Sequence, residues 1–196
     1  RDAQESRGLG DVYKRQTEEL VRLAIVDGSR LTLVAKAQGA KSGLLYDPDM
    51  GIDLRLSCSA AGHAWLMTLQ EDEAAEYVSK QGLGSPRQFG PNAPTSLKAL
   101  QAALRLHAKR GYSIIQDAYA PGMSSMAAPV RRKGEPATGV LVIAGPSARL
   151  TAKNMARFGP ELMSAADELA MSGSASPLLK AANVGTWGNR VDSGAD

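Results

Sequence analysis

The chain has 196 residues, 43% of them hydrophobic, and its 23 basic and 20 acidic residues give a net charge of +3 at pH 7. This length suffices for one domain with its own core, and the absence of any run of about 18 apolar residues predicts no membrane-spanning helix and no membrane partner. The single cysteine, Cys58, excludes an intrachain disulfide and fits a reducing cytoplasm, and the scattered basic residues form no strong footprint for nucleic acid.

The two ends of the chain differ in composition from the part between them. Residues 1–16 are charged and show no sustained period, which predicts a disordered leader. Residues 173–196 are rich in Gly, Ser, Ala and Asn, which is typical of a flexible tail. We therefore expect one domain over residues 17–172.

A β-hairpin is predicted at the start of this domain. Residues 20–26 and 31–36 are strand-like runs, and the Asp-Gly pair within residues 27–30 supplies the turn between them. Further along the chain, short strands are expected at residues 44–46 and 54–56, on either side of a loop that contains Pro and Gly.

The spacing of apolar residues along the chain then changes to that of helices. A first helix is expected after Ser57 or Ser59, because apolar residues recur at three- and four-residue spacing as far as Leu69. A second is expected over residues 71–81, with an acidic start that suits the helix dipole and Gly82 at its end.

A surface loop and the clearest helix follow. Residues 82–94 contain several Gly and Pro and are predicted to be a loop. Residues 95–110 carry a leucine stripe, two basic residues in the last turn and Gly111 as a terminator, which together predict a helix.

Three short apolar runs come next, each ended by Gly or Pro, and predict neighbouring strands. They cover about residues 111–117, 122–130 and 139–146, and residues 131–136 can close an antiparallel hairpin between the last two. Small side chains on one face of this sheet leave room for a small ligand. The residues expected to share that face are Met123, Ser125 and Ala127 on one strand and Val140, Val142 and Ala144 on the next.

A final helical stretch begins at Thr151. Its apolar residues recur at helical spacing, but Pro160 removes an interior hydrogen bond, which predicts two helical segments rather than one. Together these elements predict an α+β domain with an antiparallel sheet flanked by helices.

Four segments of the chain resemble the effector-binding domain of the IclR (isocitrate lyase regulator) family of bacterial transcription factors. They occur in the family's order and at similar spacing. The segments are Ser59 to Leu66 (SAAGHAWL), Gly111-Tyr112, Gly122 to Val130 (GMSSMAAPV) and Gly145 to Thr151 (GPSARLT). The resemblance extends over about residues 17–172.

This resemblance implies a GAF-like or profilin-like sensor domain that binds a small organic acid or aromatic metabolite and forms a homodimer or tetramer. In the family a winged helix-turn-helix precedes the domain and binds DNA. Residues 1–16 do not match such a module, so DNA binding is expected only through a part that this sequence lacks. The resemblance implies no enzymatic activity, and no cofactor or metal is expected.

The resemblance also implies an effector pocket. Carried over position by position, its residues are Leu54, Ala60, Ala61, Ile115, Met123, Ser125, Val142 and Ala144. Ser125 stands where many members have a polar-contact cysteine, Ile115 stands where aspartate is common, and Val142 and Ala144 stand where serines are common. A pocket with these departures is less polar than that of acid-binding members, so the effector is expected to be larger and partly apolar or aromatic.

Two other functions remain open from the sequence. A dimerisation module would bind no ligand and would be tightly packed around the strand ends. A small-molecule enzyme of GAF-like fold would have to use Cys58, His63 or His107, for which the sequence offers neither a third orienting group nor the spacing of a zinc site.

Overall fold

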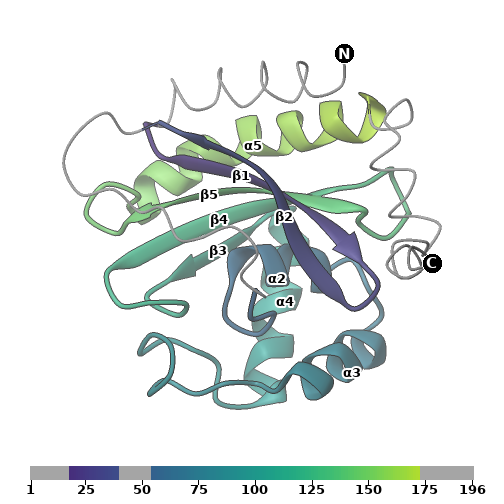
Figure 1. Ribbon diagram of the computed structural model, residues 1–196, viewed down its shortest axis with the longest axis vertical. Helices are drawn as coiled ribbons and strands as arrows, with labels where there is room; N and C mark the ends of the chain where they lie inside the picture. The colour runs from purple at the N-terminus through teal and green to yellow at the C-terminus, as the bar shows by residue number, and fades with distance from the viewer. Residues whose placement is uncertain (1–17, 40–53, 173–196) are drawn as a thin grey trace, which may run out of the picture.

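An antiparallel β-sheet runs through the middle of the described part of the chain, which comprises residues 18–39 and 54–172 (Figure 1). In this computed structural model helices cover both faces of the sheet, which confirms the predicted α+β class. The expected leader, C-terminal tail and strand at residues 44–46 lie outside the described residues.

The sheet has five strands in the order β2-β1-β5-β4-β3, and each neighbouring pair is antiparallel. The strands are β1 (Leu20–Asp27), β2 (Arg30–Gln38), β3 (Ser113–Gln116), β4 (Met123–Val130) and β5 (Gly139–Pro146). The predicted turns at residues 27–30 and 131–136 join β1 to β2 and β4 to β5. Glu19, just before β1, forms a two-pronged ion pair with Arg149, just after β5, at 2.8 and 3.0 Å, and thereby ties these strands together.

Local capping signals begin and end the helices. The described helices are α2 (Ala60–Leu66), α3 (Glu71–Gln81), α4 (Leu97–Arg110) and α5 (Ala152–Ser172). The Ser59 hydroxyl accepts a hydrogen bond from the Gly62 N–H at 3.0 Å, and the Ser96 hydroxyl caps α4 in the same way. Gly111 ends α4 with a φ of +90°, a conformation that favours glycine. No helix within the described ranges is long and apolar enough to cross a membrane.

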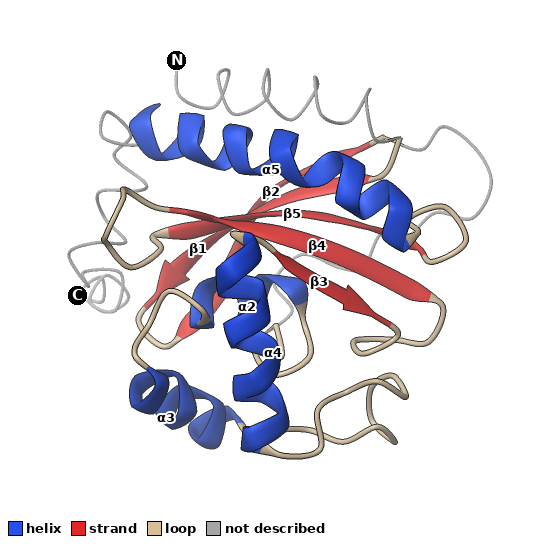
Figure 2. Cartoon of the chain, turned by 180° about the vertical axis from the view of Figure 1, so that it is seen from behind, coloured by secondary structure: helices blue, strands red, loops and turns tan. Residues whose placement is uncertain are grey.

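Figure 2 shows helices on both faces of the sheet. A hydrophobic cluster lies on each of these faces. On one face α2 and α4 bury Trp65 and Leu100, and on the other face α5 buries Phe158. Because side chains alternate along β4, Ala127 belongs to the α2 cluster while Met126 belongs to the α5 cluster. The face of the sheet that carries α2 is the one on which the sequence predicted a ligand.

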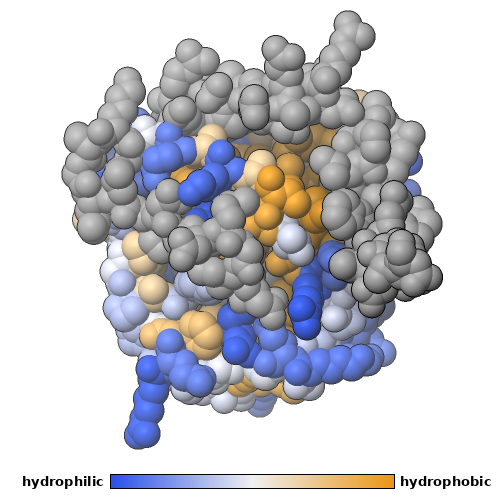
Figure 3. All heavy atoms as spheres, viewed as in Figure 1, coloured by the Kyte–Doolittle hydropathy of each residue, from blue (hydrophilic) through white to orange (hydrophobic). Residues whose placement is uncertain are grey.

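The hairpin of β1 and β2 forms one edge of the sheet. Along β2, Leu31 and Leu33 are buried while Val34 is exposed, which is the alternation of a half-buried strand. On the side of the molecule that Figure 3 presents, hydrophobic side chains gather near the centre, where this hairpin crosses the view. The inward face of β2 therefore contributes to the core beside α2.

The strand predicted at residues 54–56 is not formed. The backbone there bonds to a side chain instead of a neighbouring strand: the Leu56 N–H donates to Gln81 Oε1 at 2.7 Å, and Gln81 Nε2 donates to the Leu54 carbonyl at 2.9 Å. A glutamine on α3 thus satisfies the backbone groups that a strand partner would satisfy. A contact between positions so far apart in sequence leaves no local signal.

The prediction of two segments after Thr151 is also wrong, because α5 is one helix of 21 residues with Pro160 inside it. Proline removes one N–H bond, but the face that includes Met155, Phe158 and Leu162 is buried against the sheet on both sides of it. The packing of that face outweighs the loss of a single hydrogen bond.

Gly62 fits a helix position where no side chain has room. A Cβ atom there would overlap the backbone of Leu56, so α2 lies directly against the segment that precedes it. We expect Gly62→Ala to destabilise the fold by about 1–3 kcal/mol through overpacking, measured by urea unfolding. The reverse change at exposed Ala102, Ala102→Gly, reports helix propensity alone. If propensity decided the outcome, Gly62→Ala would instead stabilise by up to about 1 kcal/mol, and the close contact would be refuted.

Candidate functional site

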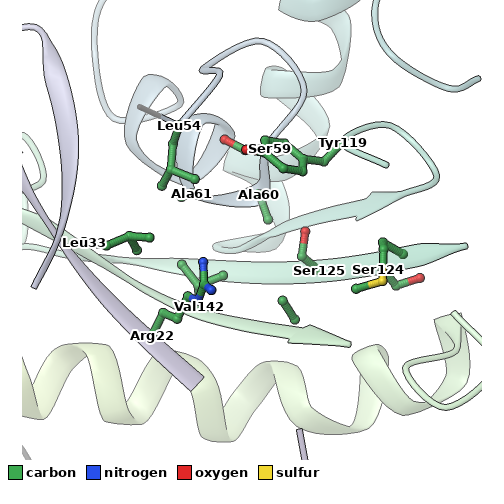
Figure 4. Close-up of a pocket in the computed structure, with 12 residues that line it drawn as sticks. Arg22, Leu33, Leu54, Ser59, Ala60, Ala61, Tyr119, Ser124, Ser125 and Val142 are labelled. Atoms are coloured by element: carbon green, nitrogen blue, oxygen red, sulfur yellow. The ribbon is translucent and has the colours of Figure 1, made fainter. Parts of the chain in front are cut away.

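A cavity of about 50 Å³ lies between the sheet and the start of α2 (Figure 4). Strands β1, β2, β4 and β5 form its floor, and α2 with its flanking loops forms the opposite wall. The residues that line it are Arg22, Leu33, Leu54, Ser59, Ala60, Ala61, Tyr119, Met123, Ser124, Ser125, Val142 and Ala144.

Seven of the eight residues predicted for the pocket meet around this cavity. They are Leu54, Ala60, Ala61, Met123, Ser125, Val142 and Ala144. The register explains the floor, because Ser125 on β4 lies opposite Ala144 on β5. The eighth, Ile115 on β3, pairs with Ser125 of β4 but is buried in the core cluster and does not line the cavity. Whether these residues bind a ligand stays a prediction.

The buried guanidinium of Arg22 is the feature of the pocket that the sequence analysis missed. Arg22 has an exposed fraction of 5% and stands on β1 in register with Val142 of β5. Its neighbours two positions away, Leu20 and Ala24, are buried at 1% and 0%. Val21 and Ile25, in the other phase, are buried as well, at 3% and 8%, so β1 is buried on both faces and its sequence pattern does not show which way Arg22 points. The pocket is therefore more polar than its predicted residues suggested.

Hydroxyl groups supply the other polar atoms of the pocket. The Ser59 hydroxyl is occupied by the Gly62 N–H, and that of Ser124 bonds to the Ser147 hydroxyl at 2.9 Å. Ser125 differs from them, because no hydrogen bond joins its hydroxyl to any other described residue. Its hydroxyl can donate to or accept from a ligand.

Tyr119 brings an aromatic ring to the pocket. This residue lines the cavity, and its ring lies 5.9 Å from the ring of Phe89, centre to centre. Leu33 from β2 is a further apolar lining residue without a sequence signal. Both positions depend on how distant segments meet.

The groups required for catalysis are not assembled at this cavity. Burial raises the pKa of the Cys58 thiol to about 11, so the group is protonated at neutral pH and is a poor nucleophile. Neither Cys58 nor the two histidines line the cavity. Across the ranges that the structure covers, no three His, Cys, Asp or Glu residues come together in a way that could hold a metal ion.

The two histidines instead join α2 to α4. The Nδ1 atoms of His63 and His107 lie 3.2 Å apart, and Nε2 of His63 lies 2.6 Å from the carbonyl oxygen of Ser57. Because a carbonyl only accepts, the neutral His63 ring carries its proton on Nε2 and presents Nδ1 to His107, which also bonds to the backbone of Ile114. Burial lowers the pKa of His63 to about 4; burial, followed by the charges of His63 and Arg110, lowers the pKa of His107 to about 3.

Comparison with known proteins gives the family. Residues 6–171 match the family model described as bacterial transcriptional regulator IclR C-terminal. The HTH-type transcriptional repressor AllR of Klebsiella pneumoniae is 32% identical over 133 residues, which cover 68% of this chain and 47% of that protein. The chain thus spans about half the length of this curated relative.

Solved structures share the fold. The IclR structure from Thermotoga maritima matches with a TM-score of 0.75 at 20% identity, over 85% of this chain and 66% of that one. The inducer binding domain of the PobR transcription factor from Acinetobacter, a double mutant in complex with 3-hydroxybenzoic acid, matches with a TM-score of 0.73 at 18% identity, over 85% of this chain and 96% of that one.

The chain is a domain of a bacterial transcriptional regulator. It belongs to the IclR family and corresponds to the family's C-terminal domain, which confirms the resemblance found in the sequence. Because the relatives are regulators and not enzymes, the prediction that the chain is no enzyme holds as well.

The histidine pair makes stability depend on pH. Both folded pKa values lie below the ordinary value of 6.5, so the unfolded chain binds protons that the folded chain excludes. Stability is therefore full above about pH 6.5 and falls as the pH is lowered toward about 4. We expect a loss of roughly 1–2 kcal/mol per histidine between about pH 6.5 and 5, measured by urea unfolding.

A matched variant separates this effect from carboxylate titration. His107→Gln keeps a side-chain amide that can bond to His63 but cannot titrate, so the pH-dependent loss should shrink by about half. An unchanged loss in His107→Gln would contradict the assignment.

Proposed function

We propose that the cavity beside α2 binds a small organic acid, and that the chain is the effector-binding part of a DNA-binding regulator. The observation that supports this most is the Arg22 guanidinium, a buried charge among the largely apolar walls of the cavity. A carboxylate matches a guanidinium well, because two N–H···O bonds form side by side. Arg22 also interacts within the protein, and five N–H donors allow it to engage the protein and a ligand together.

The remaining lining residues suit the rest of such a ligand. Ser125 offers a hydroxyl for a keto or hydroxyl oxygen, while Leu54, Met123 and Val142 offer apolar contact. Ala60, Ala61 and Ala144 leave space because their side chains are small. The pocket thus combines one charge, hydroxyl groups and apolar walls, a composition typical of small-molecule sites.

The cavity volume favours a compact acid. About 50 Å³ accommodates roughly four water molecules at about 10–15 Å³ each, a space suited to a keto acid such as glyoxylate or pyruvate. The larger or aromatic effector anticipated from the sequence requires the Leu54, Met123 or Tyr119 side chains to move. The PobR domain, which has the same fold and is in complex with 3-hydroxybenzoic acid, supports an acid as the ligand.

The proposed output is regulation of DNA binding. The AllR relative is an HTH-type repressor of which the matched part of this chain covers 47%, so a DNA-binding module would act together with this domain in the whole protein. We propose a homodimer or tetramer in the cytoplasm, in which an effector favours one arrangement of the subunits. Such a coupling is typically worth about 1–3 kcal/mol.

The charge of Arg22 is tested by replacing it with a side chain of similar length. We expect glyoxylate, pyruvate, benzoate or 3-hydroxybenzoate to raise the midpoint of thermal unfolding in a concentration-dependent way. Arg22→Met should lower the affinity for any acid that binds by about 10–100-fold, because a hydrogen bond to a charged group contributes roughly 1.5–3 kcal/mol. Because Arg22 also interacts within the protein, the shift of each variant is measured from its own ligand-free midpoint.

Arg132→Met is the control, since it removes the same charge from the exposed hairpin loop. An equal loss of acid affinity in Arg132→Met and Arg22→Met would mean that binding depends on the net charge of the protein and not on the pocket. If none of the acids shifts the midpoint and the protein forms a stable dimer, the result favours a dimerisation module instead.

The location of the site is tested by filling it. Ala144 is buried and lines the cavity opposite Ser125. We expect Ala144→Phe to abolish the ligand-induced shift, since a phenyl ring occupies the space of the acid. Ala102→Phe, at an exposed site on α4, should leave the shift intact. A normal shift in Ala144→Phe would place the ligand elsewhere.

A further inference from the structure

Residues 81–92, which run from the end of α3 into the following loop, contact two separate walls of the effector pocket. The first wall is the segment 54–57, which leads into α2. Gln81 accepts from the Leu56 N–H at 2.7 Å and donates to the Leu54 carbonyl at 2.9 Å. Since Leu54 lines the cavity, this glutamine holds the backbone of a pocket residue in place.

Two more side chains strengthen the attachment to this wall. Arg55 Nη1 donates to the carbonyl of Gln81 and, at 3.0 Å, to that of Gly82, so it caps the end of α3. The Ser57 hydroxyl donates to the Leu83 carbonyl. Bonds in both directions thus join the wall to the first residues of the 81–92 segment.

The same segment is bonded to the second wall, residues 116–119, at its other end. The Gly90 N–H donates to the Ala118 carbonyl at 3.0 Å, and the Asn92 N–H donates to the Asp117 carbonyl at 3.0 Å. Asn92 Nδ2 adds a bond of 3.0 Å to the Gln116 carbonyl. A Cβ atom at Gly90 would overlap the Asp117 carbonyl, so the two backbones are in direct contact.

Phe89 lies between the two attachments. The guanidinium of Arg55 lies 5.4 Å from the centre of its ring on one side, and the Tyr119 ring lies 5.9 Å away on the other. A Cβ atom at Gly84 would come within 2.7 Å of the Phe89 ring, so the ring packs directly against the Gly84 backbone. Figure 4 shows Leu54 and Tyr119 on the same side of the cavity, with Ser59 between them.

We propose that residues 81–92 act as a brace that holds the walls 54–57 and 116–119 together and so limits the size of the ligand, with Phe89 as the positioning residue for Tyr119. This inference rests on the proposed function of the pocket. The leucine and tyrosine side chains that line the cavity can adopt other rotamers, yet the cavity is small. The brace explains this by holding their backbone segments together. Loosening it allows the two walls to separate and the cavity to admit a longer acid.

Hydrogen exchange of the free protein tests the brace without any ligand. In Phe89→Ala, the amides of Leu56, Ser59 and Asp117 should exchange together at least about tenfold faster, because both walls lose their common support. Phe89→Tyr, which keeps the ring, should restore the wild-type rates. Glu76→Ala, on the exposed face of α3, should change none of them.

Faster exchange confined to residues 85–92 would overturn the brace, because the loop would then be only a cover. If Phe89→Ala does not fold, Phe89→Leu serves in its place, since it retains apolar bulk but has no ring to contact Tyr119. The same comparison of the two walls then decides the result.

Ligand size is the functional readout. We expect the ratio of benzoate affinity to pyruvate affinity, measured by thermal shift, to rise about tenfold in Phe89→Ala and to return to the wild-type value in Phe89→Tyr. A general loss of stability weakens the binding of both acids equally. An unchanged affinity ratio would therefore overturn the proposal. If neither acid binds any variant, the proposed function fails in this test, while the exchange rates still decide the brace.

Discussion

The position of α2 is the constraint on which the pocket depends, because this short helix forms the wall opposite the sheet. Gly62 brings it against the backbone of Leu56, and the Ser113 hydroxyl donates to the Ala60 carbonyl at 2.7 Å. His63 bonds back to the Ser57 carbonyl and across to His107. A helix of seven residues has little stability of its own, so these tertiary contacts determine where Ala60 lies.

The chemistry of the pocket arises from one charge in an otherwise largely neutral surface. An arginine buried on an interior strand of a sheet is costly unless something compensates it, and the strands around Arg22 contribute mostly apolar residues to the cavity. Such a group discriminates strongly between acids and neutral molecules of the same shape. The apolar walls discriminate less, since one methylene changes affinity by only about 1–3 kcal/mol.

Features written in neighbouring residues could be predicted from the sequence, and those that depend on distant contacts could not. The Asp-Gly turn of the first hairpin, Gly82 and Gly111 at helix ends, and the alternation along β4 are local, and each was located correctly. The cap of α2 was narrowed to Ser57 or Ser59, and the structure shows that it is Ser59. The helix through Pro160 and the lost strand at 54–56 were missed, because burial and a glutamine from α3 decided them. Arg22 and Tyr119 entered the pocket for the same reason: the pairing of β1 with β5 and the contact with Phe89 bring them there.

The strand order has a consequence for how the domain is made on the ribosome. The first hairpin reaches the rest of the sheet through the pairing of β1 with β5, so Leu20 must wait for Ala144, more than a hundred residues later. Pairing over so long a stretch of chain is slow compared with the formation of local hairpins and helices. During synthesis α2, which forms one wall of the cavity, therefore emerges before the strands of the cavity floor are complete. The cavity is complete only when the last strand is released, so a nascent chain lacks it until then.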